Sequence, residues 1–184
     1  GLATATADAN YHGPGRGAGN SLNALTDAWI LTRDDRYAEA AEAIIRRVIH
    51  PEDDIASLDL LDSEMRWSYS VFLVALSKWL DVRAEAGAID DAYAYGQQSL
   101  LHYARWMATH ERPALDHPER LEYPTATWAA QELRKANALR LAARHAEEPE
   151  RELFLRRGRE LAKRAWSDLE WFDNRFVARC LSIL

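Results

Sequence analysis

The sequence has few of the features that would place it in a specialised class. A single cysteine among 184 residues, Cys180, excludes an internal disulfide and a multi-cysteine zinc site. No apolar run approaches the ~18–20 residues that span a bilayer. Even residues 71–76, the most apolar stretch, are followed closely by Lys78 and Asp81. The sequence therefore predicts a soluble protein that does not enter a membrane.

Other absences narrow the chemistry. Neither the His-Glu-x-x-His zinc helix nor a Glu-x-x-His pair occurs, so we expect no metal and no cofactor. The net charge of −6 argues against general affinity for nucleic acid or for anionic membranes, although it allows a local basic cleft. The first ten residues are small and polar, without the basic start and apolar stretch of a signal peptide, and the compartment stays open between cytoplasm and periplasm.

What the sequence does contain is helical periodicity. Apolar residues make up 48% of the chain and seven residues are tryptophan, which is enough for a substantial core. No segment combines β-branched residues, period-two alternation and hairpin turn chemistry. We therefore expect one all-α domain over residues 1–184, which could be part of a larger protein. A loop-like lead (1–18) precedes three consecutive helical hairpins, at about 19–49, 63–110 and 125–170.

Capping residues indicate where these helices should begin and end. Asn20 or Ser21 can cap the first helix, and Asp62 or Ser63 can begin a long helix that continues to about residue 86. Gly87 should end that long helix. Asp90 and Thr125 can cap later helices, and Pro149 suits the first turn of the last one.

A polar and aromatic loop opens each hairpin. The three openings are residues 11–17, 61–67 and 121–128, and they recur roughly every 50–60 residues, the scale of a repeated helical hairpin. If the hairpins lie side by side in the same direction, the openings gather at one end of the array. The sequence thus predicts a cleft at that rim for an oligosaccharide or another polar small molecule.

The hairpin style resembles that of a known superfamily. Residues 19–29 form an apolar helix segment, and residues 31–41 follow with Thr32-Arg33-Asp34 as the turn and Tyr37 at the start of the return helix. This pattern is similar to the α/α-toroid, or six-hairpin glycosidase-like, superfamily. The resemblance implies a partial toroid, or a helical-repeat bundle, with a carbohydrate hydrolase or lyase activity. Three hairpins are about half of such a barrel, and no family catalytic motif is matched.

The first opening carries Tyr11, His12 and Arg16 among glycines. Arginine binds carboxylate or phosphate in a forked geometry, while His and Tyr transfer protons near neutral pH. A uronate lyase needs parts of this kind, a cation to neutralise the carboxylate and a base for the adjacent proton. The alternative is a solvent-facing segment without a role.

The second opening carries Glu64, Arg66, Trp67 and Tyr69. A carboxylate beside an indole is a common pairing in sugar sites, because the ring stacks on a pyranose and the carboxylate accepts hydroxyl protons. We expect Glu64 and His12 as proton-transfer residues, with Tyr11 or Tyr69 as alternatives. A capped helix start, in which Arg66 pairs with a neighbouring acid, is the structural alternative.

The third opening leads into a polar stripe on a helix that we expect to be an inner one. Unpaired polar groups are costly in a core, so this stripe should face a cleft, a buried network or solvent. The residues of this opening and stripe are Glu122, Tyr123, Thr127, Trp128, Gln131, Arg134 and Lys135. Glu122 could act with Glu64 in glycoside hydrolysis if their separation suits it.

Two functions remain open at this point. In the first, a carbohydrate-binding or carbohydrate-processing domain holds an anionic group with Arg66, Arg134 and Lys135, and stacks a ring on Trp67 or Trp128. In the second, a non-catalytic helical scaffold binds a protein or peptide, and the rim residues only terminate helices and pair with one another. The excess of arginine over lysine would then supply salt bridges between helices. The oligomeric state is not predicted.

Overall fold

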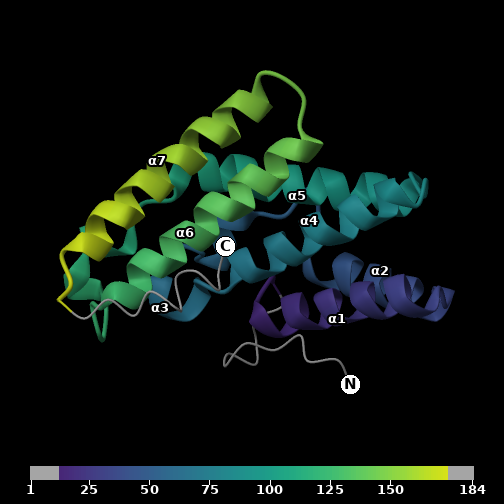
Figure 1. Cartoon of the computed structure of the whole chain (residues 1–184), viewed down its shortest axis with the longest axis horizontal. Helices are drawn as coiled ribbons and strands as arrows, with labels where there is room; N and C mark the ends of the chain where they lie inside the picture. Colours follow the sequence, from purple (N-terminus) through teal and green to yellow (C-terminus); the bar gives the residue numbers. More distant parts are fainter. Residues whose placement is uncertain (1–12, 174–184) are drawn as a thin grey trace. The chain divides into compact units, whose positions relative to one another are not determined.

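A computed structural model describes residues 13–173, and within that range every regular element is a helix (Figure 1). The all-α prediction is therefore confirmed. The α-helices are α1 (Arg16–Thr32), α2 (Asp35–Val48), α3 (Ser63–Arg66), α4 (Tyr69–Glu85), α5 (Asp91–His110), α6 (Ala126–Ala142) and α7 (Glu150–Glu170). Short 3₁₀ turns connect them: η1 (Ile55–Leu58), η2 (Ala114–Asp116), η3 (Pro118–Arg120) and η4 (Ala143–His145).

The chain divides into two compact units where the sequence predicts one domain. Within the described range, unit 1 comprises residues 13–60 and 68–103, and unit 2 comprises residues 61–67 and 104–173. The long helix α5 contributes its first part to unit 1 and its last turns to unit 2.

Unit 1 is built on α4, which is apolar on nearly every side. Phe72, Leu76 and Trp79 of α4 are almost completely buried. Helix α1 packs against α4 and against α2, whose single apolar face buries residues such as Ile44 and Ile45. The close approach of α1 to α4 depends on Gly19, since a Cβ atom there would lie 3.0 Å from the backbone of Phe72. Packing thus determines the register of α1.

Helix α1 begins earlier than capping chemistry predicts. It starts at Arg16, with Gly15 at the N-cap and no side-chain cap bond, rather than after Asn20 or Ser21. Glycine costs about 1 kcal/mol in a helix interior. Burial of Ala18 and Gly19 offsets that cost, so tertiary contacts extend the helix into the segment expected to be a loop.

The long helix predicted from Asp62 or Ser63 to residue 86 is wrong. Asp62 does cap a helix, accepting a hydrogen bond from the Met65 amide at 3.1 Å, but α3 ends after one turn and α4 begins at Tyr69. The break separates the two cores, because Trp67 packs in unit 2 whereas Tyr69 is completely buried in unit 1. Because the helix is interrupted between Trp67 and Tyr69, the two side chains can pack in different units.

Most of the remaining helix ends confirm the sequence expectations. Gly87 follows α4 with φ +72°, a left-handed conformation that glycine adopts without strain. Asp90 accepts a hydrogen bond from the Tyr93 amide at 3.1 Å and begins α5. Thr125 is the N-cap of α6. Pro149 differs by one position, since it is the N-cap of α7 rather than part of its first turn.

Unit 2 is organised around the α6–α7 hairpin, whose helices lie side by side in Figure 1. Helix α6 is buried around most of its circumference, and Gly158 of α7 lies so close to it that a Cβ atom would be 3.1 Å from the Ala136 carbonyl oxygen. The segment 111–125 connects α5 to α6 through η2 and η3. None of the helices described over residues 13–173 is both long and apolar enough to cross a bilayer.

Candidate functional site

Two of the three predicted openings meet in unit 2. The Glu64 Oε1 atom accepts a hydrogen bond from the Glu122 backbone amide at 2.7 Å, so segments 58 residues apart lie in contact. Trp67 and Trp128, one from each opening, belong to one apolar cluster with Leu121. The expectation that residues 61–67 and 121–128 become neighbours is therefore confirmed for these two segments.

The remaining predicted proton-transfer residues and Arg16 lie outside the described part of unit 2. Tyr11 and His12 of the first opening lie outside the described residues. Arg16 is exposed at the start of α1, and Tyr69 is completely buried in the core of unit 1.

The tryptophans of this region serve as packing residues. Trp128 is only 9% exposed, and its indole Nε1 donates a hydrogen bond to the Tyr123 carbonyl oxygen at 3.0 Å. The Arg134 guanidinium lies 5.3 Å from the centre of the Trp67 ring, a cation–π distance. Stacking on a sugar requires an open ring face. Trp128 does not offer one, and the guanidinium occupies a position over Trp67.

The other predicted rim residues have mixed positions. Arg134 donates a hydrogen bond to the Gln131 side chain, and burial lowers the pKa of Arg134. Arg66 and Thr127 are half-buried, whereas Glu122 and Tyr123 are exposed. Glu64 uses one carboxylate oxygen to hold the Glu122 amide, which is a structural use of the group proposed for proton transfer.

Lys135 lies in a buried ionic cluster rather than at a rim. Its Nζ atom is 2.7 Å from Glu111 Oε2 and 3.1 Å from Glu132 Oε1, and all three side chains are at most 5% exposed. Burial alone would lower the pKa of Lys135, but the two carboxylates outweigh it and raise that pKa. For Glu132, burial dominates over the attraction of Lys135 and raises its pKa. The predicted anion-binding role of Lys135 does not fit this position, and the buried-network alternative does.

This cluster also fixes the segment that follows α5. Glu132 Oε1 accepts a hydrogen bond from the Ala114 amide at 3.2 Å, while Glu111 begins the segment itself. Glu111 and Glu132 are not among the site residues that the sequence predicts. Glu132 and Lys135 are three residues apart on one helix, and this spacing is typical of an ion pair. No sequence pattern near Lys135 indicates that Glu111 is its second partner.

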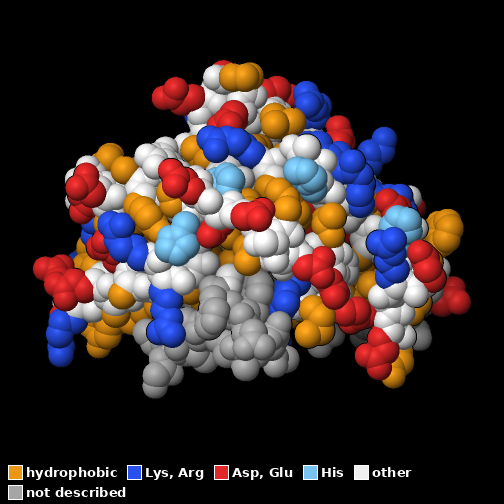
Figure 2. Space-filling view, turned by 180° about the vertical axis from the view of Figure 1, so that it is seen from behind, with side chains coloured by type: hydrophobic (Ala, Val, Ile, Leu, Met, Phe, Trp, Pro, Cys, Tyr) orange, Lys and Arg blue, Asp and Glu red, His pale blue; other side chains and the backbone are white. Residues whose placement is uncertain are grey.

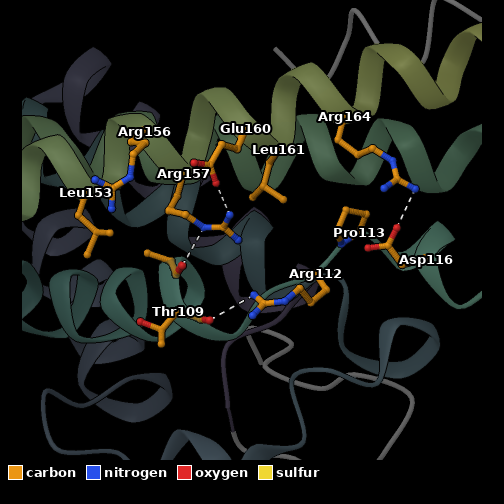
Figure 3. Close-up of a pocket in the computed structure, with 11 residues that line it drawn as sticks. Thr109, Arg112, Pro113, Asp116, Leu153, Arg156, Arg157, Glu160, Leu161 and Arg164 are labelled. Carbon is orange, nitrogen blue, oxygen red and sulfur yellow. Dashed lines mark hydrogen bonds and ion pairs between the residues drawn. The ribbon is translucent and has the colours of Figure 1, made fainter.

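A groove on unit 2 lies beside this segment. Its volume is about 540 Å³, and it is lined by residues from the end of α5, the segment 112–116 and one face of α7 (Figure 3). We call it the arginine groove. Its lining residues are Ala108, Thr109, Arg112, Pro113, Asp116, Leu153, Arg156, Arg157, Glu160, Leu161 and Arg164.

Two of the groove arginines are held by the protein. Arg157 pairs with Glu160 and donates to the backbone oxygen of Ala108 at 2.9 Å (Figure 3). It also donates to the backbone oxygen of Glu111 at 3.3 Å. Arg164 lies 2.7 Å from Asp116 and 2.7 Å from Asp168. These contacts join α7 to segment 108–116 and thereby shape the groove.

The other two arginines keep an uncompensated charge. Arg112 donates to the carbonyl oxygens of Thr109, at 3.2 Å, and Glu111, at 2.8 Å, which carry no net charge. Arg156 is exposed and, among residues 13–173, has no hydrogen-bonding or ionic partner. The face in Figure 2 shows acidic and basic side chains interspersed. The groove differs, since its lining contains four arginines and only two carboxylates.

The sequence pattern does not indicate this groove. A charged stretch such as the one after Glu147 is typical of the solvent-facing side of an outer helix. The spacing of residues does indicate one wall of the groove. One face of α7 carries residues that recur at intervals of three or four: Leu153, Arg157, Leu161 and Arg164. Their opposing wall comes from residues almost 50 positions earlier in the chain, such as Ala108, which lies 49 positions before Arg157, and no local pattern reveals this.

Comparison with protein-family models, with curated proteins and with solved structures finds no significant match for this chain. The resemblance to the α/α toroid therefore stays a prediction. Among residues 13–173, no group of three or more His, Cys, Asp or Glu side chains is arranged to hold a metal ion.

Proposed function

We propose that the protein is a non-catalytic helical-hairpin scaffold that binds an anionic partner in the arginine groove. The observation that carries this proposal is the presence of two arginines, Arg112 and Arg156, that line an open cavity and face no carboxylate partner among residues 13–173. Guanidinium groups bind carboxylates and phosphates in a forked, charge-assisted geometry. Such groups are therefore suited to an external anion.

The groove is also pre-formed. Arg157 and Arg164 already connect its two walls, and the buried Lys135 cluster holds Ala114 in place behind one of them. A binding site whose walls are fixed before the ligand arrives loses less conformational entropy on binding. The rigid framework and the two uncompensated charges together favour binding over chemistry, because no proton-transfer pair has been identified in the lining.

The direct test is titration of the full chain with poly-L-glutamate, followed by isothermal calorimetry. We expect binding that weakens as salt is raised, because the attraction is between charges near the surface. Replacing Arg156 with glutamine (R156Q) should weaken binding about fivefold, and R112Q should do the same. The matched control is R151Q, since Arg151 is exposed on α7 but does not line the groove.

Unchanged affinity in the R112Q/R156Q double variant would contradict the proposal. Absence of any binding to poly-L-glutamate at low salt would contradict it as well. Arg156 has no hydrogen-bonding or ionic partner among residues 13–173, so R156Q should fold normally, and circular dichroism with thermal unfolding will verify this.

Carbohydrate processing is retained as a second candidate because of one observation. Glu64 and Glu122, proposed as a pair of acids, do lie in adjacent segments, with the Glu64 carboxylate on the Glu122 amide. The test is a panel of neutral and acidic oligosaccharides, assayed for cleavage and by calorimetry for binding. If none binds, this candidate is abandoned.

A further inference from the structure

The chemistry of the groove narrows the kind of anion that fits it, and this inference rests on the proposed function. The lining of the groove combines charged and apolar surface. Arg112 and Arg156 supply the unpaired positive charge, and the half-buried side chains of Leu153 and Pro113 add aliphatic surface beside them. Leu161 is almost completely buried and lies at the base. The occupant should therefore carry both carboxylates and aliphatic groups.

The lining favours a polypeptide over an acidic sugar. None of its residues is aromatic, so the groove has no ring on which a pyranose could stack. A small inorganic anion would satisfy an arginine but would leave Leu153 and Pro113 without a contact. Acidic residues interspersed with leucine or valine provide both kinds of contact, and a volume of about 540 Å³ accommodates several such side chains.

We propose that the arginine groove docks an acidic segment of a partner protein. Arg112 and Arg156 receive carboxylates of that segment, while Leu153 and Pro113 contact an aliphatic side chain. Arg157 and Arg164 act as positioning residues, because Arg157 donates to the Ala108 carbonyl oxygen and Arg164 pairs with Asp116, and these contacts hold the two walls together. Charge complementarity argues for this partner, since the lining is basic although the whole chain carries a net charge of −6.

The experiment compares four probes by fluorescence anisotropy with the full chain. The first is a short labelled peptide in which glutamates flank leucines, and the second has serine in place of each leucine at the same charge. The third has glutamine in place of each glutamate. The fourth is a labelled oligogalacturonate, an acidic sugar without aliphatic side chains.

We expect the Glu/Leu peptide to bind most tightly, the Glu/Ser peptide about tenfold more weakly, and the Gln/Leu peptide more weakly still. R156Q should reduce affinity for the Glu/Leu peptide about fivefold, and L153S should remove the preference for leucine over serine. R151Q should change neither result.

The outcomes separate this inference from the proposed function. If both acidic peptides and the oligogalacturonate bind equally and R156Q weakens all three, the groove binds anions but the peptide-docking proposal fails. If the oligogalacturonate binds most tightly, the occupant is an acidic sugar and the proposal is also overturned. If no acidic probe binds, or R112Q and R156Q change nothing, the proposed function itself fails.

Discussion

Lys135 and Glu111 form an ion pair at 2.7 Å between side chains that are 5% and 3% exposed, although 24 residues separate them in the sequence. The pair connects the middle of α6 to the point where α5 ends. Because Glu132 shares the same lysine and also holds the Ala114 amide, this cluster fixes the first residues of the segment that forms one wall of the arginine groove. The framework of the site thus depends on a buried lysine.

Replacing Lys135 with methionine should destabilise the protein strongly. The change keeps the volume but leaves Glu111 and Glu132 buried without their cation, and breaking a buried pair in this way costs about 3–5 kcal/mol. Urea unfolding followed by tryptophan fluorescence measures the difference. Lys163→Met is the control, since Lys163 is exposed on α7. A K135M variant as stable as K163M would show that the buried cluster contributes little.

The pH dependence of stability should reveal Glu132. Because burial raises the pKa of Glu132 above its ordinary value of 4.5, the folded state holds this proton more tightly than the unfolded state. The stabilisation is fully present below pH 4.5 and is lost as pH rises through the folded-state pKa. Glutamine does not titrate. The free energy of unfolding of the unmodified protein, relative to that of E132Q, should therefore fall as pH increases above 4.5.

Parallel stability curves for the protein and E132Q over that pH range would mean that Glu132 has the same pKa in the folded and unfolded states. Glu119→Gln is the control for a carboxyl at the surface, because Glu119 is exposed and its carboxylate pairs with His117. Its pKa is lowered below the ordinary value of 4.5, first by a backbone hydrogen bond, so the free energy of unfolding of the protein relative to that of E119Q should stay level above pH 4.5 and fall as pH drops below it.

Substitution of Gly19 with alanine tests the α1–α4 packing in unit 1. Alanine is the better helix former by about 1 kcal/mol, so helix propensity alone predicts a gain in stability. The new Cβ atom would instead lie 3.0 Å from the Phe72 backbone, which cannot move aside as a side chain could. We expect a net loss of about 1–3 kcal/mol by chemical unfolding. Asn20→Ala, at an exposed position of the same helix, should cause no loss, and equal behaviour of the two variants would contradict the close approach.

The elements that follow from local chemistry were predictable. Asp90 and Thr125 begin helices because their side chains satisfy backbone amides within the next three residues. Gly87 ends α4 because it adopts a positive φ. The early start of α1 and the break before Tyr69 were not predictable, since both are set by contacts with residues elsewhere in the chain.

The same distinction holds for the candidate site. Recurrence of the openings predicted that Glu64 and Glu122 would lie close together, and they do. Spacing on α6 showed that Lys135 belongs to a polar stripe, but not that Glu111 would meet it inside the core. The arginine groove needs Arg112 and Arg156 to be brought together by the packing of α7 against the end of α5. No pattern along the sequence contains that information.

The most direct measurement is chemical-shift mapping by NMR on the isotopically labelled full chain during titration with poly-L-glutamate. Binding in the arginine groove predicts that amide and arginine side-chain signals change first and most strongly in residues 108–116 and 153–164, the two walls of the groove. Changes centred on residues 61–67 and 121–128, or on unit 1, would place anion binding elsewhere and contradict it.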